Sequence, residues 1–137
     1  MFIKLITALL MAILTFSASA FEFKGTDTAL PSKEAFKVFV ERSDNNITII
    51  FDIEKNYYLY KDKIEFLVDD KKIETKMPNG FIKNDSYFGK VEVYPLDFKV
   101  ELNNEFFYDA KTLTIKHQGC AEVYDLCYVP RIDVFKI

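Results

Sequence analysis

The sequence predicts an all-β domain, an antiparallel β-sandwich of immunoglobulin-like type, and three observations support this prediction. Apolar and polar residues alternate with a period of two in several short segments, which is the pattern of strands that bury one face. Turn-forming residues separate many of these segments, as in SDNN, VDDKK, MPNG and ELNNE. No segment carries a sustained helical stripe. We therefore expect about seven to nine short strands in one domain.

The strand signals follow one another along the chain. FKVFVE opens the series, and NITIIFDIE gives the strongest signal because Ile47, Ile49, Phe51 and Ile53 occupy every second position. The expected strands cover residues 36–41, 46–54, 63–68, 90–94, 97–102 and 111–117. The markers of antibody domains are missing, since the two cysteines are close neighbours in the sequence and the chain has no tryptophan.

Residues 1–20 have the pattern of a secretory signal peptide. Lys4 precedes an apolar run from Leu5 to Phe16, and small residues follow at Ala18, Ser19 and Ala20. The run is shorter than the roughly 20 residues of a membrane-spanning helix. Cleavage after Ala20 leaves residues 21–137 as a single domain. We expect the product in the periplasm or an equivalent exported space, where disulfides are permitted.

Charge and composition limit the range of possible functions. The formal net charge of −3 argues against nucleic acid or an anionic membrane surface as a partner. Two cysteines and one histidine fall short of the four ligands of a structural zinc site, and there is no glycine-rich phosphate loop. We therefore expect neither a metal nor another cofactor.

The cysteine pair, Cys120 and Cys127, lies in HQGCAEVYDLCYVP and allows two interpretations. In an antiparallel hairpin the two residues can lie opposite one another, close enough for a disulfide. A loop of about eight residues gives such a bond only roughly 2.5 kcal/mol in the chain-entropy model. The pair is therefore either a passive bridge of modest value or a redox-active dithiol, and the second interpretation is favoured.

The single histidine, His117, is the obvious candidate for activating the thiols. In a regular strand it shares a face with Leu113 and Ile115, whereas Cys120 lies on the opposite face. We expect a structural role for His117. Glu122 and Asp125 are the charges near the pair, and carboxylates disfavour a thiolate. The dithiol is then expected to wait for a reactive thiolate on a partner.

Three stretches carry a family resemblance. HQGCAEVYDLCYVP, NYYLYKDKIEF and KNDSYFGKVEVY are similar, in order and spacing, to blocks of the N-terminal periplasmic domain of DsbD-type thiol:disulfide interchange proteins. The resemblance implies an immunoglobulin-like fold with the cysteines on neighbouring strands at one end. It also implies electron transfer from a membrane-embedded reductant to thioredoxin-fold periplasmic proteins, including disulfide isomerases and cytochrome c maturation factors.

The same resemblance assigns roles to residues. Cys127 matches the cysteine that forms the mixed disulfide with partners, and Cys120 matches the one that closes the intramolecular bond. Six residues match the cap loop and the lining of the site in that family: Asp85, Tyr87, Phe88, Gly89, Tyr58 and Tyr60. The alternative for each tyrosine is a half-buried core residue.

Two departures from the family pattern bear on these expectations. Six residues separate the cysteines, where the family more usually has five. The chain ends at Ile137, so the electron donor is expected on a separate, membrane-embedded chain. The alternative function is that of a secreted immunoglobulin-like binding or assembly module in which the disulfide is a passive bridge.

Overall fold

The computed structural model describes residues 28–137. The signal peptide predicted at residues 1–20, and the first residues of the predicted domain, lie outside this range. Within it the protein is nearly all β, as the alternating pattern predicted. One short helix, α2 (Ser32–Ala35), precedes the first strand, and single 3-10 turns occur at η2 (Lys61–Lys63), η3 (Asn104–Phe106) and η4 (Glu122–Tyr124). No helix in residues 28–137 is long and apolar enough to span a membrane.

Three antiparallel sheets make up the fold. The first has the order β1 (Phe36–Arg42), β2 (Asn46–Ile53), β8 (Phe98–Asn103). The second has the order β12 (Arg131–Lys136), β9 (Thr112–His117), β4 (Glu65–Val68), β5 (Lys71–Ile73). The third has the order β11 (Leu126–Cys127), β10 (Gly119–Ala121), β3 (Tyr57–Tyr60), β7 (Gly89–Tyr94), β6 (Phe81–Asp85).

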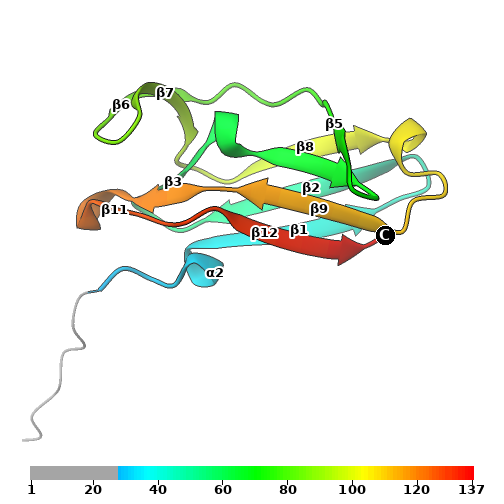
Figure 1. Ribbon diagram of the computed structural model, residues 1–137, viewed down its shortest axis with the longest axis horizontal. Coiled ribbons are helices and arrows are strands. Elements are labelled where there is room, and N and C mark those ends of the chain that lie inside the picture. Colours follow the sequence, from blue (N-terminus) through cyan, green and yellow to red (C-terminus); the bar gives the residue numbers. More distant parts are fainter. Residues whose placement is uncertain (1–27) are drawn as a thin grey trace, which may run out of the picture.

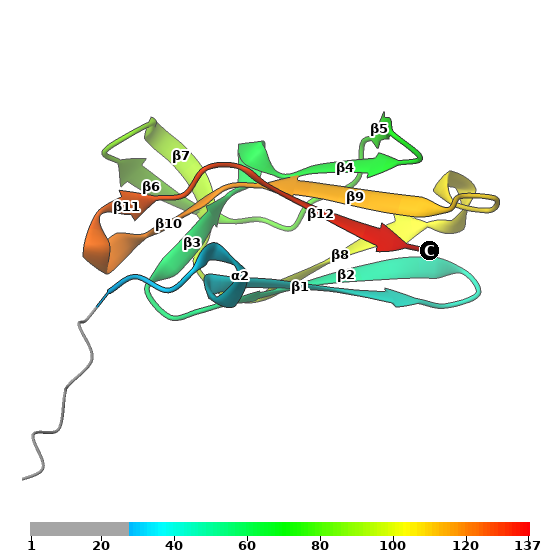
Figure 2. The same ribbon diagram turned by 60° about the horizontal axis from the view of Figure 1, so that its bottom comes forward.

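The first two sheets face one another as the layers of a sandwich, and the third lies at one end, remote from the C-terminus (Figure 1 and Figure 2). Strand β3 follows β2 after a short turn, and β10 follows β9 after Gln118 alone. The two layers therefore each send one strand into the end sheet, where these strands pair with one another.

The core lies between the two layers. Every second residue of β2 is buried, and Ile47, Ile49 and Phe51 are fully enclosed. Leu113 and Ile115 of β9 face them from the opposite layer and belong to the same cluster. The period-two pattern thus decides which face of each strand forms the core.

The strand segments in residues 28–137 number twelve, more than the seven to nine expected. The additional ones are mostly short, and β3 is buried at all four positions and so gives no alternation. The strand expected at residues 63–68 begins only at Glu65, because Lys61–Lys63 form a 3-10 turn.

Candidate functional site

The two cysteines lie directly opposite one another in the end sheet. Cys120 of β10 pairs with Cys127 of β11 in the antiparallel register, and a disulfide joins them across a Cα–Cα distance of 4.0 Å. This confirms the hairpin geometry expected from the sequence. Cys120 is 2% exposed, whereas Cys127 is half-buried on β11, the edge strand of the sheet. Cys127 is therefore the sulfur that a second molecule reaches more easily.

The six residues between the cysteines fit a compact turn. Glu122–Tyr124 form the 3-10 turn η4, and Asp125 then adopts a left-handed conformation with φ 48°. The backbone amide of Asp125 donates to the carbonyl of Glu122 at 3.3 Å, and the amide of Glu122 donates to the carbonyl of Asn56 at 2.9 Å. The longer loop therefore keeps the two cysteines in register.

Gly119, immediately before Cys120, is required by close packing. A Cβ atom at this position would lie 2.4 Å from the carbonyl oxygen of Tyr58 and 2.6 Å from the ring of Phe36. Only glycine allows β10 to approach β3 so closely. This approach places Cys120 opposite Tyr58 in the sheet register.

Strand β3 supplies the aromatic wall of the site. Tyr57 and Leu59 point into the main core, whereas Tyr58 and Tyr60 pack with the disulfide in a separate cluster. The division follows from the period of two along a strand. The Tyr60 hydroxyl lies 2.9 Å from Sγ of Cys120 and 3.5 Å from Sγ of Cys127, close to both sulfurs.

A buried carboxylate, Asp85, organises the tyrosines and the loop after β6. Its Oδ2 accepts hydrogen bonds from the hydroxyls of Tyr58 and Tyr60, the latter at 2.8 Å. Its Oδ1 accepts the backbone amides of Tyr87 at 2.8 Å and Phe88 at 3.0 Å. One side chain, 6% exposed, thus joins the tyrosine wall to the loop.

These contacts determine the ionisation of the site. Burial alone raises the pKa of Asp85, but the hydrogen bonds it accepts outweigh burial and hold the pKa below its ordinary value. Burial, with the adjacent Asp85, raises the pKa of Tyr58 to about 12. Burial and hydrogen bonding to Tyr58 and Asp85 also raise the pKa of Tyr60. At neutral pH, Asp85 is ionised and both tyrosines keep their protons.

The turn between β6 and β7 borders the same pocket as the disulfide. Gly89 begins β7 with φ 73°, a conformation that other residues rarely adopt. The ring edge of Phe88 packs on Tyr60 with the ring centroids 5.0 Å apart. Tyr87 is 55% exposed, and its hydroxyl donates to the backbone carbonyl of Asp125 at 2.9 Å.

A pocket of about 200 Å³ opens between this turn and the cysteine hairpin. It is lined by Tyr58, Lys83, Asn84, Asp85, Ser86, Tyr87, Cys120, Ala121, Glu122, Asp125, Leu126 and Cys127. The structure therefore gathers the residues proposed for the site at one end of the sandwich. Tyr60 lies behind the sulfurs rather than in the pocket wall, and Phe88 and Gly89 lie at the turn.

Sequence analysis missed several residues that line this pocket, among them Lys83 and Ser86. For Lys83 the contacts are specific. Its Nζ forms an ion pair with Glu122 and lies 5.2 Å from the centroid of the Tyr58 ring. A signal for it existed, because Lys83 is two residues before Asp85 on β6 and so shares its face of the strand.

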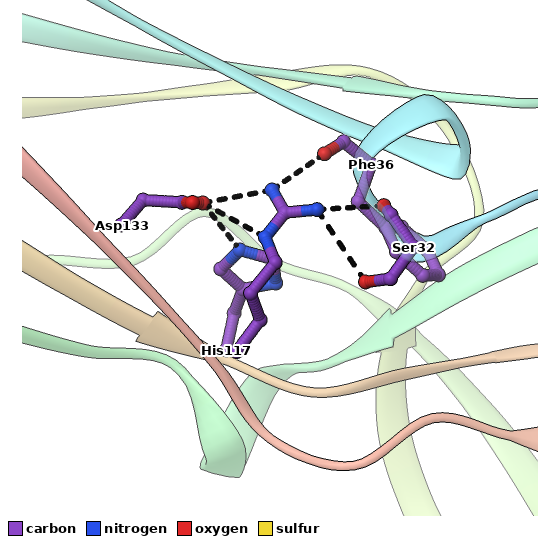
Figure 3. Close-up of polar contacts among 5 residues, drawn as sticks. Ser32, Phe36, His117 and Asp133 are labelled. Atoms are coloured by element: carbon purple, nitrogen blue, oxygen red, sulfur yellow. Dashed lines mark hydrogen bonds and ion pairs between the residues drawn. The ribbon is translucent and has the colours of Figure 1, made fainter.

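His117 takes no part in this site, as predicted. It is 1% exposed, and its Nε2 lies 3.0 Å from Oδ2 of Asp133. Arg131 binds the same carboxylate oxygen and donates to the backbone carbonyls of Ser32 and Phe36 (Figure 3). Burial lowers the pKa of His117, although Asp133 acts in the opposite direction. This network attaches the segment before β1 to β9 and β12.

Comparison with known proteins assigns the chain to a family. The family described as "Thiol:disulfide interchange protein DsbD, N-terminal" matches residues 26–137. The chain belongs to this family. It is 29% identical over 125 residues to the thiol:disulfide interchange protein DsbD of Escherichia coli K12 and 26% identical over 129 residues to that of Citrobacter koseri. These matches cover 89% and 93% of this chain but only 22% of each relative.

Two solved structures share the fold. The reduced N-terminal domain of Neisseria meningitidis DsbD is 30% identical, with a TM-score of 0.68 over 79% of this chain and 88% of that one. A complex between the DsbD N-terminal and PilB N-terminal domains of the same organism contains a chain that is 26% identical. The TM-score is 0.66 over 80% of this chain and 88% of that chain. The fold is thus the immunoglobulin-like β-sandwich that the sequence predicted.

Proposed function

We propose that this domain performs thiol–disulfide exchange in the periplasm, alternating between the Cys120–Cys127 disulfide and the corresponding dithiol. The observation that carries the proposal is the position of the bond. The disulfide joins the buried Cys120 to the half-buried Cys127 on an edge strand beside an open pocket. Family membership supports this chemistry. The alternative, a binding module with a passive bridge, is not favoured, because a structural bridge needs no pocket at its sulfur.

The exchange follows from the difference between the two sulfurs. A donor thiolate attacks Sγ of Cys127, the Cys120–Cys127 bond breaks, and Cys120 leaves as a thiolate. A second donor thiol then attacks the donor sulfur of the mixed disulfide and releases Cys127. The domain is now a dithiol, and the donor is a disulfide. Two electrons enter the domain, and Cys120 and Cys127 each take up one proton. Delivery reverses this order, with Cys127 attacking the disulfide of an acceptor and Cys120 closing the ring.

Tyr60 is placed to assist the leaving sulfur. Its hydroxyl donates to Asp85 in the disulfide form, yet it also lies 2.9 Å from Sγ of Cys120. A hydroxyl has one proton and can redirect it toward a new negative charge. The ionised Asp85 beside it acts in the other direction, because a nearby negative charge disfavours a lasting thiolate. The reduced pair is therefore expected to rest as thiols until a partner arrives.

The turn that carries Tyr87 and Phe88 acts in this proposal as a cap. Rings over the sulfurs exclude stray thiols and oxidants, and a partner must displace them. We expect that Tyr87→Ala, more than Phe88→Ala, speeds oxidation of the reduced domain by a small disulfide and leaves the fold intact. Stopped-flow kinetics measure this effect, and equal rates for the wild type and both variants would contradict the shielding role.

The partners in this proposal are thioredoxin-fold periplasmic proteins as acceptors and a membrane-embedded donor on another chain. The complex of the meningococcal DsbD N-terminal domain with the PilB N-terminal domain supports a protein partner at this fold. No cofactor is required, since cysteine sulfurs carry the electrons.

Two measurements test the function. The reduction potential of the purified domain is expected well above the roughly −300 mV limit typical of structural bridges. A lower value, with sulfurs inert in the folded protein, favours the passive bridge. With Cys120→Ala, the free Cys127 should trap a mixed disulfide with a thioredoxin-fold partner, and the matched Cys127→Ala variant should not. Trapping through Cys120 alone would reverse the two roles.

A further inference from the structure

Two hairpins face one another across the pocket beside the disulfide. The β6–β7 hairpin carries the cap, and the β10–β11 hairpin carries the cysteines. The Tyr87 hydroxyl donates to the Asp125 carbonyl at 2.9 Å, and the Ser86 hydroxyl lies 3.4 Å from the Asp125 carboxylate. Lys83 pairs with Glu122 on the same side. The three contacts therefore link the cap directly to the turn between the cysteines.

We propose that these contacts form a latch that holds the cap closed, with the Tyr87 hydroxyl and the Asp125 carbonyl as its positioning groups. The inference rests on the proposed exchange function and adds the residues that discriminate a protein partner from a small thiol. A small thiol has too little contact area to displace the cap and must wait until the latch opens. A protein partner can open it by replacing the lost contacts with its own surface.

The acceptor of the latch is held in position by the cysteine turn. Asp125 has φ 48°, and its amide bonds the carbonyl of Glu122, so the direction of its own carbonyl is determined by the end of η4. Asp and Asn adopt this left-handed conformation more readily than most other residues. The six-residue spacing between the cysteines thus supplies the residue that the cap binds.

The two cap aromatics are held differently. Phe88 packs on Tyr60, and the Nζ of Lys63 lies 5.0 Å from the centroid of the Phe88 ring. Tyr87 is 55% exposed, and its hydroxyl donates a hydrogen bond to the cysteine hairpin. Removing that hydroxyl therefore releases the outer part of the cap, while the ring remains available as a shield.

The test compares how fast dithiothreitol reduces the disulfide form of the domain. Tyr87→Phe keeps the ring and removes the hydrogen bond, and a bond of ordinary net strength changes the ratio of open to closed cap by roughly two- to tenfold. We expect reduction to accelerate by that factor. Tyr94→Phe is the matched control, because the Tyr94 hydroxyl also donates to a backbone carbonyl, that of Pro78 at 2.6 Å, outside the pocket. Its rate should equal that of the wild type.

The outcomes separate the latch from the exchange function. If Tyr87→Phe behaves like the wild type while Tyr87→Ala reacts faster, the ring shields the sulfurs without a latch, and the inference is wrong although exchange stands. If the folded domain is inert to thiols in every variant, the exchange function fails as well. With thioredoxin as a protein reductant, Tyr87→Phe should accelerate reduction less than with dithiothreitol. Equal acceleration would contradict discrimination by the latch.

The ion pair is tested by a variant that preserves net charge. Lys83→Gln combined with Glu122→Gln removes the pair and leaves the long-range attraction of the reagent unchanged. A partly exposed pair gives an acceleration of up to roughly fivefold at low salt. The difference from the wild type should disappear near 1 M salt, where the wild-type pair is screened. Equal rates at low salt would exclude the pair from the latch and restrict it to Tyr87 and Asp125.

Discussion

Two carboxylates of this domain have a pKa held below the ordinary value by the hydrogen bonds they accept, yet they belong to different networks. Asp133 accepts from Arg131 and lies against His117, so a cation neutralises it within the network. Asp85 accepts from two tyrosine hydroxyls and two backbone amides, all uncharged. The negative charge of Asp133 is therefore neutralised by the adjacent Arg131, whereas the negative charge of Asp85 has no cation among its hydrogen-bond donors and lies near the disulfide.

The two networks also differ in what they contact. The guanidinium of Arg131 also donates to the carbonyls of Ser32 and Phe36, so that network connects three segments of backbone. Asp85 lines a pocket and reaches the sulfurs through Tyr60. A network neutralised by its own cation stabilises the fold, and an unneutralised one that borders a pocket can act on a reaction.

The largest effect on stability is expected from Arg131→Met. The variant leaves the His117–Asp133 pair without its cation and removes the guanidinium donor from two carbonyls, so we expect a loss of about 2–4 kcal/mol in the free energy of unfolding. Urea denaturation measures it. Arg42→Met, at the end of β1, is the control and should change the free energy by less than about 1 kcal/mol. If the folded Arg131→Met variant reduced its disulfide at a different rate from the wild type, the Asp133 network would affect reactivity as well as stability. That result would contradict the separate roles of the two networks.

Removal of the disulfide should cost less. Cys120 and Cys127 already lie on hydrogen-bonded strands, so replacing both by Ala should lower the free energy of unfolding by no more than about 2–3 kcal/mol. The sandwich is expected to remain folded, with an unchanged far-ultraviolet circular dichroism spectrum. An unfolded double variant would show that the bridge is needed for folding.

The charge of Asp85 should matter more for reactivity than for folding. Asp85→Asn keeps an acceptor for the tyrosine hydroxyls and removes the negative charge, so the thiolate fraction of the reduced pair should rise about tenfold at neutral pH. The rate of alkylation by iodoacetamide reports that fraction. Asp133→Asn is the matched carboxylate change in the other network and should leave the alkylation rate at the wild-type value. An unchanged rate in Asp85→Asn would remove Asp85 from the chemistry.

The smallest expected effect is a pH dependence of the free energy of unfolding that arises from His117 in the Asp133 network. Burial holds the pKa of His117 below its ordinary value of 6.5, so the unfolded chain binds a proton more readily than the folded one. The stabilisation is complete above about pH 6.5 and is lost as the pH falls toward the lower folded pKa, by at most about 1.4 kcal/mol per pH unit. Urea midpoints between pH 7.5 and 5 should fall in the wild type and fall less in His117→Gln. Parallel curves would assign the loss to other groups.

The fold class and the register of the cysteines could be predicted from the sequence. Alternation in β2 and β9 specified which faces are buried, because successive side chains of a strand point to opposite sides. The same rule separated His117 from Cys120, whereas Tyr58 and Tyr60 were assigned to the site only through the family resemblance. Strand β3 and the short strands of the end sheet were less visible, since full burial or a length of two or three residues leaves no period to detect.

The sequence by itself determined these local faces and, through its resemblance to a family, the residues that gather at the site. Only the tertiary structure decided how they connect: that Asp85 accepts both tyrosine hydroxyls, that Lys83 meets Glu122, and that Tyr87 reaches the carbonyl of Asp125. The partners in each of these contacts are separated by 25 to 39 residues along the chain. Strand periodicity is a short-range steric property, whereas such contacts arise only when the tertiary fold of the end sheet brings one hairpin against another.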